Sequence, residues 1–158
     1  MYYKYNNITI YYEKYGTKGK DILILPGWGN TSKTFYNIIN HLKENNTVYI
    51  IDYPSFGKSP IPKKNLTIYN YADLIRNFLI QKNITSPIII AHSFGGRITT
   101  LLAGYYKIKI DKLILIDNID TLIDRVKNES NGNIYTMVCF DMTEIIRKKI
   151  LEDNNGKN

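Results

Sequence analysis

The sequence lacks the features that mark several protein classes. Its 158 residues include a single cysteine, Cys139, which excludes an internal disulfide and suits a reducing compartment. No apolar run approaches the roughly 18 residues that a membrane span needs. Residues 1–7 lack the apolar core of a secretory signal. These absences predict a cytoplasmic protein that has no membrane partner.

Acidic residues are scarce, with 14 Asp and Glu against 21 Lys and Arg, which gives a net charge of +7. Such an excess suits a nucleic-acid partner, but it also suits a chain rich in Lys, Asn, Ile and Tyr, as AT-rich coding DNA produces. The basic residues are scattered, and only 63–64 and 147–149 cluster, without an aromatic stacking motif. We therefore expect no nucleic-acid partner, because net charge alone governs solubility and non-specific attraction.

Hydrophobic patterning predicts one domain of alternating strands and helices. Alternating residues on either side of an Asn6-Asn7 turn predict an antiparallel hairpin of strands 2–5 and 8–15. Continuous apolar runs, typical of strands buried on both faces, occupy 21–25, 47–51, 88–91 and 112–116. Helical spacing of apolar residues predicts helices at about 31–44, 69–82 and 97–106. This order predicts an α/β fold, with a mostly parallel sheet, right-handed crossovers and helices on both faces.

The pattern weakens after Asn118. We interpret residues 1–118 as the core and residues 119–158 as an irregular or helical segment of the same domain. Within that segment, 134–140 fits a strand or the start of a helix, and 143–151 fits an amphipathic helix. Unless residues 134–151 cover it, the strand 112–116 becomes an exposed sheet edge, which predicts self-association.

The most informative stretch is residues 88–96, in which β-branched residues lead into a small residue, a serine and two glycines. It fits a strand that ends in a tight turn and feeds a helix. The turn is expected to hold Ser93 in a strained conformation with its hydroxyl exposed. Ala91 and Gly95 are small where strand and helix nearly touch. A serine at this place is usually only a helix N-cap, but its small neighbours favour a nucleophile.

Four predicted strand ends carry motifs that together resemble the α/β-hydrolase superfamily. The first two are an oxyanion loop, Leu25-Pro26-Gly27-Trp28-Gly29, and a D-x-P-G-F-G-x-S loop at residues 52–59, with Ser55 where glycine is usual. The third is an elbow, Ala91-His92-Ser93-Phe94-Gly95-Gly96, which has the form G-x-S-x-G with alanine first. The fourth is a sixth strand, Leu113-Ile114-Leu115-Ile116-Asp117. The resemblance covers about residues 1–118 and implies an α/β-hydrolase fold with an incomplete C-terminal part.

The resemblance also implies roles. Ser93 would be the nucleophile, and the backbone N–H groups of Phe94 and of the Gly27-Trp28 loop would form the oxyanion hole. One such donor is worth about 3–4 kcal/mol in a dry site. The Trp28 and Phe94 side chains would wall the acyl pocket, although Trp28 equally fits a core or loop aromatic. No cofactor and no metal is implied.

Two further interpretations concern the loop at 52–60. Asp52 fits a carboxylate that braces loops better than a catalytic acid. Residues 57–59 are similar to the end of a phosphate-binding P-loop. That interpretation fails because the required earlier glycine falls at Asp52 and because Pro60 interrupts any helix.

A serine nucleophile needs a general base, and in this superfamily the acid and then the histidine follow the serine. Residues 94–158 contain no histidine. His92 adjoins Ser93, but its side chain is expected to point into the sheet or the neighbouring loop. His41 is expected on the solvent side of the first helix. Neither histidine is therefore a credible base.

Acid candidates do follow Ser93. Asp117 and Asp120 come after the sixth strand, and Asp141 could follow a seventh. Asp117 also fits a structural residue at a strand end. Without a base, these carboxylates have no partner to orient.

Three functions therefore stay open. The first is a serine hydrolase of small ester, thioester or amide substrates that works through an acyl-enzyme and is weak or inactive as this chain. The second is a truncated, inactive relative or one half of a split enzyme. The third is a binding module that holds a small molecule over Ser93 without turnover.

Overall fold

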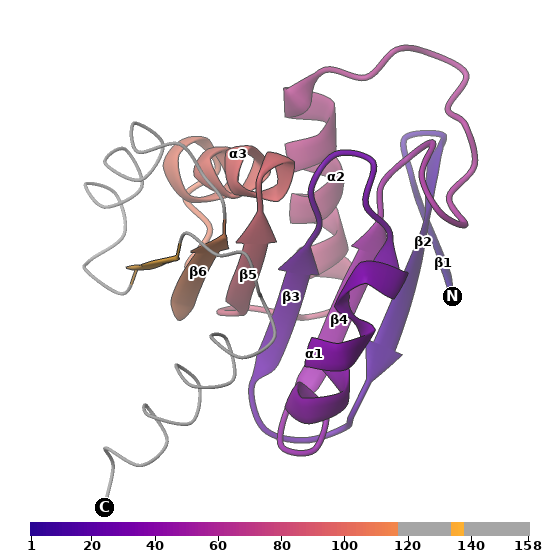
Figure 1. The fold of residues 1–158 in the computed structure, drawn as a ribbon. Helices are drawn as coiled ribbons and strands as arrows, with labels where there is room; N and C mark the ends of the chain where they lie inside the picture. Colours follow the sequence, from indigo (N-terminus) through magenta and orange to yellow (C-terminus); the bar gives the residue numbers. More distant parts are fainter. Residues whose placement is uncertain (117–133, 138–158) are drawn as a thin grey trace, which may run out of the picture.

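The computed structural model describes residues 1–116 and 134–137 of the chain (Figure 1). These residues form a mixed sheet of seven strands in the order β1-β2-β4-β3-β5-β6-β7. The strands are β1 (Tyr2–Tyr5), β2 (Ile8–Tyr15), β3 (Asp21–Leu25), β4 (Thr47–Asp52), β5 (Ile88–His92), β6 (Lys112–Ile116) and β7 (Ile134–Met137). The helices are the 3-10 turn η1 (Ser32–Phe35), α1 (Tyr36–Leu42), α2 (Ile68–Gln81), α3 (Phe94–Thr100) and the π-helical turn η2 (Leu101–Tyr105).

The predicted hairpin is confirmed. β1 and β2 pair antiparallel, with Tyr5 opposite Ile8, and β2 then pairs antiparallel with β4. The two turn residues, Asn6 and Asn7, have φ values of 46° and 63°. Positive φ at both positions is what a two-residue hairpin turn requires, and asparagine tolerates it better than most residues.

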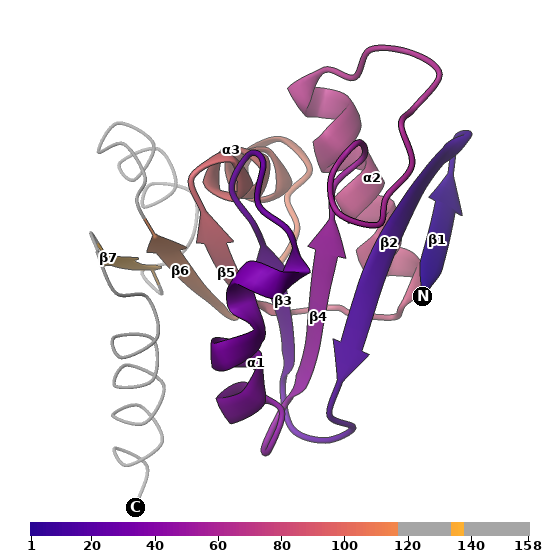
Figure 2. The same cartoon turned by 45° about the vertical axis from the view of Figure 1, so that its right-hand side comes forward.

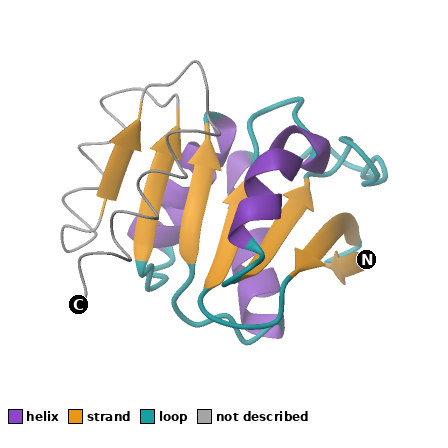
Figure 3. Ribbon diagram, turned by 60° about the horizontal axis from the view of Figure 1, so that its bottom comes forward, coloured by secondary structure: helices purple, strands orange, loops and turns teal. Residues whose placement is uncertain are grey.

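The parallel sheet is also confirmed, because β3 pairs in parallel with both β4 and β5, and β6 pairs in parallel with β5. Figure 2 shows α1 on one face of the sheet and α2 and α3 on the other. Successive residues of β3 point to opposite faces, so Ile22 and Ile24 pack under α1 while Leu23 and Leu25 pack under α2 and α3. Each such buried side chain stabilises the fold by about 1.5–3 kcal/mol. Figure 3 shows the strands side by side, with helices packed against the sheet.

Two predicted helices differ from the structure at their starts. The helix expected from about residue 31 begins as the 3-10 turn η1, and Thr31 makes no side-chain cap. The first-turn N–H of Ser32 donates instead to the Asp52 carboxylate at 2.7 Å, a partner distant in sequence. The helix expected at 97–106 starts earlier, at Phe94, because the turn after β5 leads directly into it, and it ends in the π-helical turn η2.

β6 is not an exposed sheet edge, because residues 134–137 cover it, which is the exception that the prediction from the sequence allowed. β7 pairs with it in parallel, from Leu113 opposite Ile134 to Ile116 opposite Met137. The strand interpretation of 134–140 is thus confirmed for residues 134–137, and self-association stays a prediction. The segments expected at 119–133 and 143–151 lie outside the described residues. No helix within 1–116 is long and apolar enough to cross a membrane.

Candidate active site

Ser93 lies in the turn between β5 and α3, at the carboxyl end of the parallel strands (Figure 1). Its backbone has φ 46° and ψ −107°, and its side chain is exposed. The Ser93 N–H donates to the Ile116 carbonyl oxygen at 3.0 Å, which ties the turn to the end of β6. A non-glycine residue in this conformation carries a strain of about 1–3 kcal/mol. The predicted strained, exposed serine is therefore confirmed as a conformation.

Gly95 explains why the turn needs small residues. A Cβ atom at Gly95 would overlap the carbonyl oxygen of Leu25, the last residue of β3. The close approach predicted from the sequence is confirmed, but it is to the neighbouring strand β3. Further along α3, the Thr99 hydroxyl donates to the Gly95 carbonyl oxygen at 2.9 Å.

His92 points into the loop after β3, which is one of the two directions expected. Its Nδ1 lies 3.2 Å from the side-chain nitrogen of Asn30, at hydrogen-bond distance. A Cβ at Gly27 would lie 2.6 Å from the same Nδ1, so only glycine leaves room for the ring. His92 thus fastens the loop at 27–30 to the elbow. His41 lies on the exposed side of α1, as expected.

Phe94 is the first residue of α3, so its backbone N–H has no acceptor within that helix. Trp28 lies on the loop that His92 fastens beside the elbow. The arrangement is compatible with an oxyanion hole made by these two N–H groups. Their role in binding an oxyanion stays a prediction.

Asp52 braces the loops around the site and is almost fully buried, with 1% of its surface exposed. Its carboxylate accepts from the N–H of Ser32 at 2.7 Å and from the N–H of Lys58 at 3.0 Å. The Ser59 hydroxyl donates to the Asp52 carbonyl oxygen. At Gly57, a Cβ would overlap the carboxylate. The interpretation of Asp52 as a bracing residue is confirmed.

Five aromatic rings form a cluster beside the elbow, which we call the aromatic cluster: Trp28, Tyr53, Phe56, Tyr71 and Phe94. The Trp28 ring centre lies 4.9 Å from that of Phe56 and 5.0 Å from that of Phe94. Phe94 also packs edge-on against Tyr53 and Tyr71. Trp28 is 61% exposed, so it is a loop aromatic and no part of the core.

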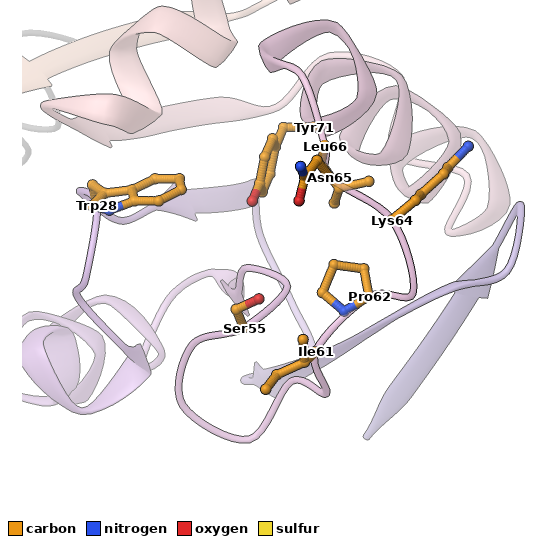
Figure 4. Close-up of a pocket in the computed structure, with 8 residues that line it drawn as sticks. All are labelled: Trp28, Ser55, Ile61, Pro62, Lys64, Asn65, Leu66 and Tyr71. Atoms are coloured by element: carbon orange, nitrogen blue, oxygen red, sulfur yellow. The ribbon is translucent and has the colours of Figure 1, made fainter.

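A cavity of about 290 Å³ opens beside the aromatic cluster (Figure 4). It is lined by Trp28, Ser55, Ile61, Pro62, Lys64, Asn65, Leu66 and Tyr71. Trp28 therefore lines a pocket, whereas Phe94 does not line it but packs on Trp28. That this pocket holds an acyl group stays a prediction. The sequence did not reveal Asn65 or Tyr71 as lining residues. The only signal for Ser55 was its place at a position where glycine is usual.

Two tyrosine hydroxyls of the aromatic cluster have a raised pKa. Burial raises the pKa of Tyr71 above its ordinary value. Burial also raises the pKa of Tyr53 well above its ordinary value, and the Tyr53 hydroxyl has no hydrogen-bond partner in the described part of the chain. Both phenols are therefore neutral near pH 7.

Asp117, Asp120 and Asp141 lie outside the described residues, so the acid stays a prediction. Within residues 1–116 and 134–137, no group of three His, Cys, Asp or Glu side chains that could hold a metal ion lies together. The site as described thus consists of Ser93, the Phe94 N–H at the start of α3 and the pocket that Trp28 lines.

Residues 21–133 match the family model described as alpha/beta hydrolase fold. The chain belongs to this family. It is 27% identical over 113 residues to a Drosophila melanogaster protein named "Probable serine hydrolase", covering 69% of this chain and 34% of that protein. It is 26% identical over 115 residues to "Uncharacterized hydrolase YugF" of Bacillus subtilis, covering 70% and 41%.

Solved structures of α/β-hydrolases share the same fold. The crystal structure of an alpha/beta hydrolase fold protein from Burkholderia ambifaria superposes with a TM-score of 0.71 at 18% identity, covering 75% of this chain and 44% of that one. The α/β-hydrolase chain described here thus spans less than half the length of these relatives.

Proposed function

We propose that this α/β-hydrolase is a serine hydrolase of small ester, thioester or amide substrates, with Ser93 as the nucleophile. The observation that supports the proposal is the Ser93 backbone, at φ 46° and ψ −107°, which presents an exposed hydroxyl between β5 and α3. A serine that only capped the helix would accept a hydrogen bond from the first turn, and Ser93 makes no such bond.

In the proposed reaction, the Ser93 Oγ attacks the carbonyl carbon of the substrate and gives up its proton to a base. The N–H groups of Phe94 and Trp28 hold the negative oxygen of the tetrahedral intermediate. The intermediate then expels the alcohol, thiol or amine, which takes up a proton and leaves an acyl-enzyme. Water attacks the acyl-enzyme, releases the carboxylic acid and restores Ser93.

The base limits the rate. Residues 94–158 contain no histidine, His92 is bonded to Asn30, and His41 faces solvent on α1. For these 158 residues on their own, hydroxide or buffer would take the Ser93 proton, and we expect slow turnover that rises with pH. Oxyanion binding alone still supplies about 10³–10⁴-fold over water. Asp117 remains the proposed acid, with a role only where a histidine is supplied.

The same absence of a histidine favours a second candidate, a module that binds a small molecule without turning it over. In that case the pocket beside the aromatic cluster is the functional feature, and Ser93 is a remnant of the fold.

A fluorophosphonate probe tests the nucleophile directly, because it phosphonylates activated serines. We expect the folded wild-type chain to be labelled and Ser93→Ala to be unlabelled. Ser86→Ala, at the opposite end of β5, is the matched control and should keep the label. A folded wild-type chain that stays unlabelled up to pH 9 would rule out the hydrolase and leave the binding module.

A further inference from the structure

The pocket beside the aromatic cluster carries three uncharged hydrogen-bonding side chains on an otherwise mostly apolar wall. They are Ser55, on the loop after β4, Asn65, on the loop before α2, and Tyr71, on α2. In Figure 4 their hydroxyl and amide groups face the same space. The Lys64 ammonium points away from them (Figure 4). The polar part of the pocket is therefore neutral.

Tyr71 is the most firmly held of these three side chains, because only 6% of its surface is exposed. Its ring is fixed edge-on against Tyr53, Phe94 and Trp28, at centre distances of 5.8, 5.3 and 6.2 Å. Its hydroxyl has no hydrogen-bond partner among residues 1–116 and 134–137. Unlike the Tyr53 hydroxyl, it is not fully buried, so it is open to a molecule that enters the pocket. A ligand in the pocket would supply the missing partner.

Ser55 points the same way for a separate reason. Its φ is +75°, in the left-handed region where a side chain is disfavoured and glycine is not. Its N–H donates to the Pro60 carbonyl oxygen, but its hydroxyl has no partner in the described part of the chain. Compared with glycine, serine at this position adds strain, and what it contributes is a hydroxyl without a described partner on the pocket wall.

We infer that the pocket takes the acyl part of a small substrate that carries an uncharged hydroxyl or carbonyl group away from the bond to be cleaved. Assigning it to the acyl part rests on the proposed function. Tyr71, Ser55 and Asn65 select this group over a plain hydrocarbon chain, which only the apolar wall would hold. Trp28 connects the pocket to the turn that carries Ser93, because it lines the pocket and also packs on Phe94, the neighbour of Ser93. A cavity of about 290 Å³ suits a small ligand.

The test measures binding without turnover. Trp28 is the only tryptophan in the chain and lies in the pocket wall, so its fluorescence reports occupancy. Hexanamide and its ω-hydroxy derivative are titrated into the wild-type chain. We expect the hydroxy compound to bind about 3- to 10-fold more tightly, the effect of one hydrogen bond. The corresponding ω-carboxylate should bind no better than the hydroxy compound.

Variants then assign the selectivity. Tyr71→Phe and Ser55→Gly should each bring the affinity ratio of the two amides toward one. Tyr69→Phe is the matched control, since Tyr69 lies on the same helix but is exposed and packs on Tyr105. It should leave the ratio unaltered.

Several results would overturn the inference: no binding of either amide, equal affinities, a ratio that survives Tyr71→Phe and Ser55→Gly, or tightest binding of the carboxylate. The same titrations in Ser93→Ala separate this inference from the hydrolase proposal. If the chain prefers the hydroxy amide but wild-type Ser93 is not labelled by the fluorophosphonate, the pocket specificity stands and the hydrolase is rejected. If wild-type Ser93 is labelled but the two amides bind equally well, only the pocket specificity is rejected.

Discussion

Replacing Asp52 by alanine should be the most damaging single change around the site. The carboxylate is 1% exposed and accepts from two backbone N–H groups, those of Ser32 at 2.7 Å and Lys58 at 3.0 Å. Hydrogen bonds to a charged group contribute about 1.5–3 kcal/mol each, so losing both costs about 3–6 kcal/mol. Domains of ordinary stability have only about 5–15 kcal/mol to lose.

Asparagine at position 52 makes the estimate sharper. It keeps the size of the side chain and one acceptor oxygen, but it turns an amide nitrogen toward one of the two donors. We therefore expect Asp52→Asn to cost about half as much as Asp52→Ala. It also serves as the measurable variant if Asp52→Ala does not fold.

Urea unfolding followed by circular dichroism provides the measurement. Asp111→Ala is the control, because Asp111 is half-buried and makes an ion pair with the exposed Lys20 at 3.1 Å. Such pairs contribute at most about 1 kcal/mol. A loss below about 1 kcal/mol for Asp52→Ala, or a loss equal to that of Asp111→Ala, would refute the bracing role.

Three other changes test separate parts of the structure. Gly95→Ala should destabilise the fold by about 1–3 kcal/mol in urea unfolding, since the new Cβ meets the Leu25 carbonyl oxygen; a neutral result contradicts the close approach. Tyr53→Phe should raise the melting temperature, because it removes a buried hydroxyl that lacks a partner in the described residues, and a fall of more than a few degrees opposes this. For Glu13, burial raises the pKa, but hydrogen bonds from three tyrosine hydroxyls lower it, and the result lies below the ordinary 4.5. Its stabilisation is therefore full above pH 4.5 and lost as pH falls through the lowered pKa. Melting curves of Glu13→Gln should change less with pH in that window, and parallel curves for both proteins would contradict it.

The sheet was predictable wherever burial on both faces leaves an uninterrupted apolar run. β3 and β4 are buried along nearly their whole length, and their sequences show it directly. Helix starts were less predictable because distant partners determine them. The N–H of Ser32 finds its acceptor on Asp52, which local sequence cannot indicate.

The site shows the same division. The conformation of Ser93 followed from local spacing, since the room for the turn depends on small residues two positions before and after it. The pocket did not follow, because its wall joins the loops at 28 and 55–66 to α2. The Asp52 carboxylate, which accepts from the N–H groups of Ser32 and Lys58, braces those loops. In the sequence, nothing distinguishes Tyr71 from any other aromatic residue on an amphipathic helix.

The sheet order also has a consequence for the sequence of events during folding. β3 lies between β4 and β5, and its last residue, Leu25, pairs with Ala91, which is far away along the chain. Closing so long a loop is entropically costly, and folds rich in such contacts fold slowly. During synthesis the middle of the sheet must wait until β5 has emerged from the ribosome. Ser93, the residue after β5, therefore reaches its strained conformation only when the core beneath it closes.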